Sequence, residues 1–133
     1  MQFGGDIGIG PEDISRLEPE IAYVTSNSDI EAIALVTDSG YQIAYAAINR
    51  SIDSDALCGI ASALTSTSNM VTKTVFNENL SEVIVRAGNG YIVVSNAGRF
   101  VLVGAAQNIQ NMMKTVKVFR VASQRIASQF PRF

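Results

Sequence analysis

The sequence predicts an α+β domain that combines a five-stranded antiparallel sheet with three helices. Two observations predict this class. Three long segments repeat apolar residues at three- and four-residue intervals, which is the period of a helix. Five short apolar runs have the length of strands, two before the middle helix and three after it, and short turns separate them within each group. The expected order is helix, two strands, helix, three strands, helix.

The 133 residues are expected to form one domain over residues 11–133, preceded by a flexible, glycine-rich arm over residues 1–10. The first helix is predicted from Pro11 to about Thr25. Proline suits a first helical turn, and apolar residues share one face of the segment that follows. Pro19 lies inside that pattern and should kink or restart the helix.

A hairpin is predicted next, with strands over residues 30–37 and 41–48 around the turn Asp38-Ser39-Gly40. The first of these strands is apolar on both faces. It should therefore be central in the sheet and covered on both sides.

The middle helix is predicted from Asp53 to Phe76, with Asp53, Ser54 or Asp55 as its cap. One helical face carries the residues that we expect to pack on the sheet. These core residues are Leu57, Ile60, Ala61, Leu64, Ser68 and Val71.

The second half of the chain predicts three strands and a final helix. The strands are expected over residues 80–88, 91–96 and 100–107, and the helix over residues 109–129. Asn89-Gly90 is the preferred sequence of a type I′ turn between the first two strands. Gly98 should take a positive φ in the turn between the last two.

Charge is distributed unevenly along the chain, although the net charge is only −2. Ten acidic and two basic residues lie up to Ser66, and two acidic and eight basic residues lie from Thr67 onward. The basic residues do not cluster with stacking aromatics, so we expect the two halves to pack together and do not expect nucleic-acid binding.

The residues for common catalytic and metal chemistry are missing. The chain has no histidine and one cysteine, Cys58, which we interpret as a small packing residue. No phosphate-loop motif occurs, and Arg50 and Arg99 each lie near a turn, where a solvated arginine needs no function. We therefore expect a non-enzymatic protein without cofactor or metal. A lone cysteine, no signal peptide and no membrane-spanning segment indicate the cytoplasm.

The middle helix lacks the charged residues that an exposed helical face normally carries. No charged residue occurs from Ala56 to Thr72. Beside the core stripe runs a second stripe of mostly small residues, which would let another helix approach closely. Its members are Ala56, Gly59, Ala63, Thr67 and Met70. This pattern predicts that a second copy of the chain, or alternatively a loop or the arm of the same chain, covers the helix.

The strand over residues 80–88 gives a second indication of self-association. Glu82, Ile84 and Arg86 lie on one face of it. If two such strands pair about a two-fold axis at Ile84, each Glu82 faces Arg86 of the other copy. The alternative is that these charges protect a free sheet edge from aggregation.

Taken together, these segments resemble the roadblock (dynein light chain) family over about Leu17 to Phe130. The family's first hairpin, in which an apolar strand ends in Asp-x-Gly, is similar to IEAIALVTDSGYQIAY. Its central helix is similar to DSDALCGIASALTSTSNMV, and the hairpin before its last helix is similar to GYIVVSNAGRFVLVGAAQ-N. The chain departs from many members early in the last helix, where it reads Met112-Met113-Lys114-Thr115-Val116.

The resemblance implies a profilin-like fold with strand order 2-1-5-4-3, in which the central helix lies on one face of the sheet and the other two helices on the opposite face. It also implies a homodimer, or a heterodimer with a roadblock paralogue, built through the central helices and third strands. Members act as scaffolds or regulators of small Ras-like GTPases or as dynein adaptors, and activating members need no arginine finger of their own.

A second hypothesis is a small-molecule sensor of profilin-like or PAS-like type. It predicts a cavity near the sheet that is lined by Tyr41, Tyr45 and Tyr91.

Overall fold

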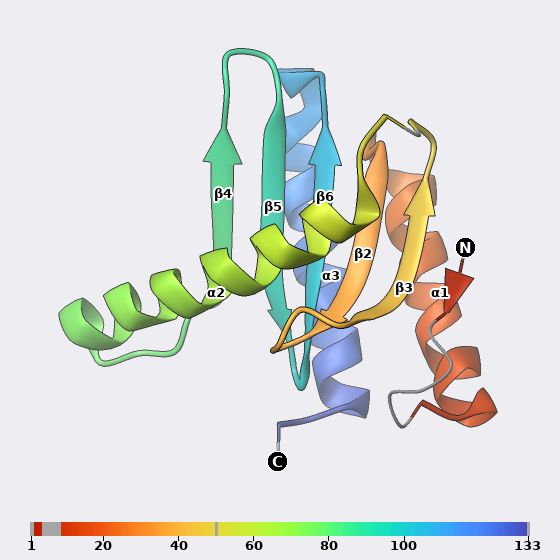
Figure 1. The fold of residues 1–133 in the computed structure, drawn as a ribbon, viewed down its shortest axis with the longest axis horizontal. Helices are drawn as coiled ribbons and strands as arrows, with labels where there is room; N and C mark the ends of the chain where they lie inside the picture. The colour runs from red at the N-terminus through yellow and green to blue at the C-terminus, as the bar shows by residue number, and fades with distance from the viewer. Residues whose placement is uncertain (1, 4–8, 50, 133) are drawn as a thin grey trace.

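The computed structural model describes residues 2–3, 9–49 and 51–132, and its elements follow the expected order after a short additional strand (Figure 1). The helices are α1 (Pro11–Asn27), α2 (Ser54–Phe76), the 3-10 turn η1 (Ile109–Asn111) and α3 (Met112–Gln129). The strands are β1 (Gln2–Phe3), β2 (Ala32–Thr37), β3 (Gln42–Ala47), β4 (Glu82–Arg86), β5 (Tyr91–Ala97) and β6 (Phe100–Ala106).

All neighbouring strands pair antiparallel, in the order β1-β3-β2-β6-β5-β4. Without β1 this is the predicted order 2-1-5-4-3, so the predicted fold class is confirmed. The additional strand comes from the stretch predicted as a flexible arm and pairs Gln2 with Tyr45 and Phe3 with Ala44. The rest of that arm, apart from residues 9 and 10, lies outside the described residues.

The sheet is covered on both faces, as Figure 1 shows, with α2 on one face and α1 and α3 on the other. Each face has its own apolar core. Ile33 and Leu35 of β2 belong to the core beneath α1 and α3, whereas Ala34 and Val36 belong to the core beneath α2. The prediction that this strand is central and buried on both sides is therefore confirmed.

Gly104 of β6 allows the close packing of the core beneath α1 and α3. A Cβ atom at this position would lie 2.5 Å from the ring of Phe119 and 2.7 Å from Cδ1 of Ile30. Both side chains are buried. Any side chain at position 104 would displace them, so the strand needs glycine here.

The acidic first helix packs beside the basic last helix. Arg125 of α3 lies 3.6 Å from the carboxylate of Glu20 on α1, and its guanidinium stacks over the ring of Tyr23. Arg16 of α1 donates to the backbone carbonyl of Gln129 at 2.8 Å. The contact between α1 and α3 thus pairs charges from the two halves of the chain.

The prediction for Asn89-Gly90 is wrong, and of the two effects predicted for Pro19, a kink or a restart, the restart does not occur. Neither Asn89 nor Gly90 has a positive φ, so the turn is not type I′. Pairing of β4 with β5 ends at Arg86 and Tyr91, which leaves a four-residue loop where a type I′ turn needs two. Helix α1 also continues through Pro19 without a restart. Pro19 lies on the exposed side, where water can satisfy the carbonyl that loses its partner.

The turn at Gly98 is as predicted, with φ +68.

Candidate functional site

Helix α2 is longer than the sheet is wide. Its 23 residues make a rod of about 35 Å, whereas five strands span roughly 19 Å at about 4.8 Å per step. Figure 1 shows α2 crossing the sheet and extending past the β4 edge. All four of its buried residues lie in its first half: Leu57, Cys58, Ala61 and Thr65. Asp53 caps the helix by accepting the N–H of Asp55 at 3.1 Å.

The predicted second stripe of α2 is exposed along its whole length. This holds for each of Ala56, Gly59, Ala63, Thr67 and Met70. A Cβ atom added at Gly59 would meet nothing within 4 Å. Within the described parts of the chain, therefore, no loop covers this stripe.

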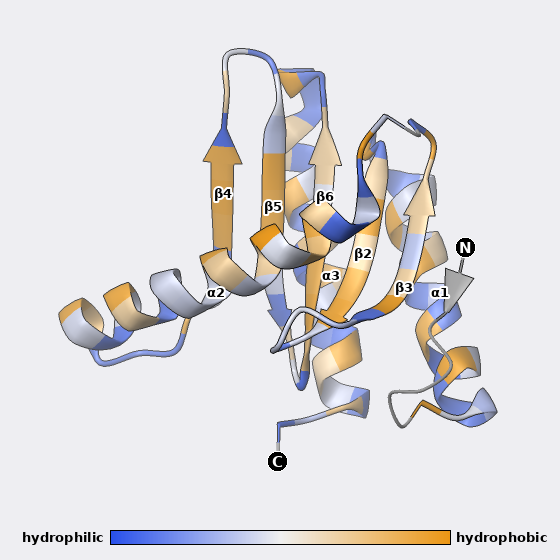
Figure 2. Cartoon of the chain, in the orientation of Figure 1, coloured by the Kyte–Doolittle hydropathy of each residue, from blue (hydrophilic) through white to orange (hydrophobic). Residues whose placement is uncertain are grey.

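The exposed side of α2 also carries large apolar side chains that sequence reasoning placed in the core. Ile60 is 40% exposed and Val71 is 52% exposed, so their assignment to the core stripe is wrong. Met70, Val75 and Phe76 near the end of the helix are exposed as well. For the residues from Met70 onward the physical reason is the overhang, because the last turns of α2 have no strand beneath them (Figure 2). Ile60 lies in the part of α2 that packs on the sheet, but it is next to exposed Gly59, at the flank of the buried stripe. A comparison of the length of the uncharged helix with the width of five strands would have predicted that the apolar residues at the end of α2 are exposed.

Strand β4 continues this apolar region at the edge of the sheet. Among the strands of the described residues it pairs with β5 alone, so none of them covers its outer edge. Ile84 and Val85 are exposed large apolar residues of this strand, one on each face. We define the α2/β4 surface as the exposed stripe of α2, its large apolar side chains and the β4 edge.

Glu82 already has a partner within the chain. Its carboxylate accepts two hydrogen bonds from Arg120 of α3, both at 2.8 Å, and this raises the pKa of the guanidinium. Arg86 is exposed near the other end of β4. The strand therefore presents one neutralised charge and one solvated charge on the face that also bears Ile84.

The remaining candidate residues have structural roles. Cys58 is buried, and burial raises the pKa of its thiol, with a smaller effect from Asp55. Arg99 stacks over the ring of Phe130, and Arg50 lies outside the described residues. Among the described residues, no group of three or more His, Cys, Asp or Glu side chains could hold a metal ion. Nor does any described helix have the length and apolar character needed to cross a membrane.

The three tyrosines predicted to line a sensor cavity do not come together. Tyr91 is buried in the core beneath α1 and α3 and donates to Thr115 Oγ1 at 2.9 Å. Tyr45 packs on the opposite face, where its hydroxyl donates to the carbonyl of Ile52, and Tyr41 is exposed at a turn. The alternation of side chains along strands separates them, so the predicted cavity is wrong.

Comparison with solved structures shows the same fold in several proteins. The gliding protein MglB from Thermus thermophilus superposes with a TM-score of 0.80 at 13% identity, covering 94% of this chain and 96% of that chain. An MglB structure with a tetrameric arrangement gives 0.79 at 14% identity, covering 95% and 98%. A roadblock/LC7 domain from Streptomyces avermitilis gives 0.70 at 14% identity, covering 82% and 92%.

At the sequence level, none of the curated proteins compared with the chain matches it. The family model of the Roadblock/LC7 domain does match, over residues 21–106. The match begins within α1 and ends with β6, so it includes α2 and the five predicted strands. It covers more than half of the chain, which therefore belongs to the roadblock/LC7 domain family.

Proposed function

We propose that this protein is a non-enzymatic dimeric scaffold or regulator that binds small Ras-like GTPases in the cytoplasm. One observation carries the proposal: the α2/β4 surface is apolar, uncharged over most of α2 and uncovered within the described chain. A monomeric soluble protein rarely leaves such a surface in water. We infer a GTPase partner because members of the roadblock family act as scaffolds or regulators of small Ras-like GTPases.

Two copies of the chain can cover this surface for each other. Antiparallel pairing of two β4 strands about a two-fold axis at Ile84 would join the sheets into one. The overhanging ends of α2 would then reach across the junction, where the small side chains at Gly59 and Ala63 allow close approach. Arg86 of each copy would approach the Glu82–Arg120 pair of the other and add a second guanidinium to that carboxylate.

An MglB protein of the same fold is described in a tetrameric arrangement, which supports self-association of this fold. A regulator built in this way would act on a GTPase by binding and reshaping it. Arg99 contributes to packing against Phe130, so the proposal gives it no role as an arginine finger.

The first test is molar mass in solution, measured by light scattering after size exclusion. We expect wild-type protein near twice 14.2 kDa and Ile84→Arg near 14.2 kDa. Met113→Arg is the matched control, because Met113 is an exposed apolar residue of α3 away from the α2/β4 surface. A wild-type mass of 14.2 kDa, or equal loss of dimer in both variants, would contradict the proposed dimer.

The second test is binding to small Ras-like GTPases of the same cell, each loaded with GDP or with a non-hydrolysable GTP analogue. We expect one GTPase to bind in one nucleotide state, and Ile84→Arg to weaken that binding while Met113→Arg leaves it unchanged. If the protein is a dimer but binds no GTPase in either nucleotide state, the proposed GTPase partner is contradicted and the proposed dimer is not.

A further inference from the structure

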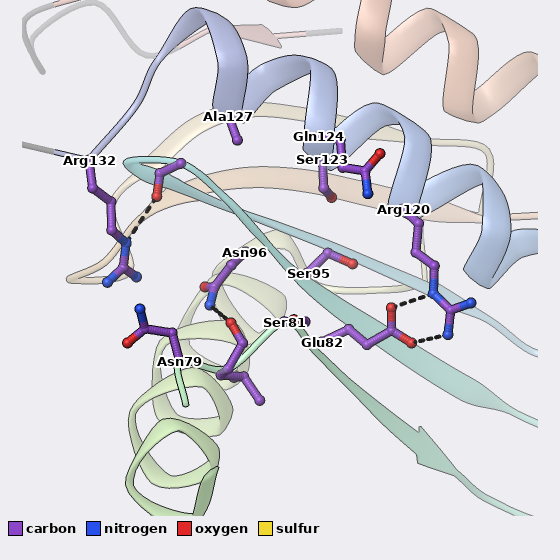
Figure 3. A pocket seen from close by; sticks show the side chains of 12 residues that line it. Asn79, Ser81, Glu82, Ser95, Asn96, Arg120, Ser123, Gln124, Ala127 and Arg132 are labelled. Carbon is purple, nitrogen blue, oxygen red and sulfur yellow. Dashed lines mark hydrogen bonds and ion pairs between the residues drawn. The ribbon is translucent and has the colours of Figure 1, made fainter. Parts of the chain in front are cut away.

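A cavity of about 320 Å³ lies on the opposite face of the sheet from α2, between α3 and the strands β4 and β5 (Figure 3). Helix α3 packs mainly along β5, so the α3-facing side of β4 is left partly open (Figure 1). The cavity is thus bounded by the start of β4, the end of β5, the outer flank of α3 and the C-terminal segment. Its volume is at the lower end of the range found for small-molecule sites.

Two buried hydroxyl groups in this cavity have no hydrogen-bond partner in the described structure. Ser95 of β5 is 3% exposed and Ser123 of α3 is 4% exposed, and both line the cavity. Figure 3 shows Ser123 extending from the helix toward the strand that carries Ser95. Such groups destabilise a fold unless something satisfies them.

Another buried hydroxyl of α3 shows that the fold can satisfy such groups. Thr115 lies two turns before Ser123 and is also buried, but it accepts a hydrogen bond from Tyr91 at 2.9 Å. The hydroxyls of Ser95 and Ser123 differ in facing a cavity instead of a protein partner. This contrast points to a partner that enters from outside.

The hydrogen-bonding groups of the cavity define what that partner must offer. The hydroxyls of Ser95 and Ser123 can each donate and accept, so both can bond to a ligand hydroxyl. The cavity also has an arginine at each end, Arg120 and Arg132 (Figure 3). Glu82 fixes Arg120, and Arg132 donates to the carbonyl of Gly98 at 3.3 Å. Each guanidinium has further N–H groups, which only acceptors can satisfy.

The charges that line the cavity favour an anion. One carboxylate, Glu82, faces two guanidiniums, so the lining carries a net charge of one positive unit. Both oxygens of that carboxylate are already used by Arg120. An apolar ligand would leave the serine hydroxyls unsatisfied, and a metal cation would be repelled by the arginines.

We propose that this cavity binds a small hydroxylated organic anion, such as a hydroxycarboxylate or a sugar phosphate. Its hydroxyl bonds to Ser95 or Ser123, and its anionic group accepts from Arg120 or Arg132. All of these groups belong to one protomer, and in the proposed dimer Arg86 of the other copy would add a further positive charge beside Glu82.

Amide chemical-shift titration by NMR tests this with pairs of probes that differ in one group. Malate and succinate differ by a hydroxyl, and glycerol 3-phosphate and glycerol differ by the anionic group. We expect malate or glycerol 3-phosphate to shift the amides of residues 79–82, 95–98 and 120–127 to saturation, whereas succinate, glycerol and inorganic phosphate bind more weakly. Which of the two binds distinguishes a carboxylate ligand from a phosphate ligand.

The variant Ser95→Ala/Ser123→Ala should weaken that binding by roughly tenfold, since the buried hydrogen bonds to the ligand hydroxyl are lost. Its fold should be at least as stable as wild type, because two unsatisfied hydroxyls are removed. Thr65→Val is the matched control: Thr65 also has a buried hydroxyl without a partner, but it lies on α2, on the other face of the sheet. The proposal fails if no probe binds, or if the double variant binds like wild type. It also fails if neither pair shows a difference, so that malate binds like succinate and glycerol 3-phosphate binds like glycerol. In each case the cavity holds only water.

Discussion

The two faces of the sheet are covered to very different degrees. Helix α3 buries seven of its 18 residues and shares its face with α1, whereas α2 buries four of its 23 residues and lies alone. The longer helix therefore contributes less to the core of its own chain. It carries no charge from Ala56 to Thr72, although much of it is exposed. A helix that is both apolar and uncovered has a second surface to bury, so we interpret the α1/α3 face as the folding face and the α2 face as the binding face.

The largest expected effect comes from comparing two phenylalanines, one on each face. Phe119 of α3 is fully buried and Phe76 of α2 is 64% exposed. Phe119→Ala should lower the free energy of unfolding by about 3–5 kcal/mol, and Phe76→Ala by less than about 0.5 kcal/mol. Urea unfolding followed by circular dichroism measures both. Similar losses in the two variants would break the distinction between a folding face and a binding face.

Substitutions of two glycines, one on each face of the sheet, are expected to have effects of intermediate size. Gly104→Ala should cost about 1–3 kcal/mol of unfolding free energy, because its Cβ would overlap Phe119 and Ile30. Gly59→Ala should raise that free energy by up to about 1 kcal/mol, because alanine favours a helix and nothing lies nearby in the single chain.

The same Gly59→Ala change should weaken the dimer, if two α2 helices approach closely there. Thermal unfolding and sedimentation of one protein sample separate the two effects. A Gly59→Ala protein that is both more stable and equally dimeric would exclude Gly59 from the contact between helices.

The smallest expected effect is a pH dependence on the α2 face. Burial raises the pKa of the Cys58 thiol above its usual 9.0, so the folded state holds this proton more tightly than the unfolded state. The resulting stability is fully present below pH 9.0 and is lost as the pH rises through the pKa of the folded state. Urea unfolding at neutral pH and above pH 9.0 should show a smaller alkaline loss for Cys58→Ala than for wild type. Equal losses would show that the thiol does not contribute.

Local pattern was enough to predict the order of helices and strands, because apolar periodicity directly reflects which side chains face a core. It was not enough to predict which strands are neighbours, since pairing between distant strands leaves no local trace. That order came from the family resemblance. The exposure of Val71 was missed because periodicity identifies an apolar face but not whether a sheet lies beneath it. The exposure of Ile60 was missed because periodicity does not fix where the edge of the buried stripe falls. The cavity was missed because Ser95 and Ser123 lie far apart in the sequence and nothing in the local pattern brings them together.

Strand β1 limits how far such a protein can assemble. A protomer with two open sheet edges could bind a neighbour at each and polymerise without end. The two residues of β1 pair with β3, which lies at the edge of the sheet opposite β4. A two-residue strand then forms that edge, and it is too short to pair with a strand of another molecule. In the proposed dimer each protomer would then have one sheet edge left for pairing, so we expect association through β4 to stop at two copies.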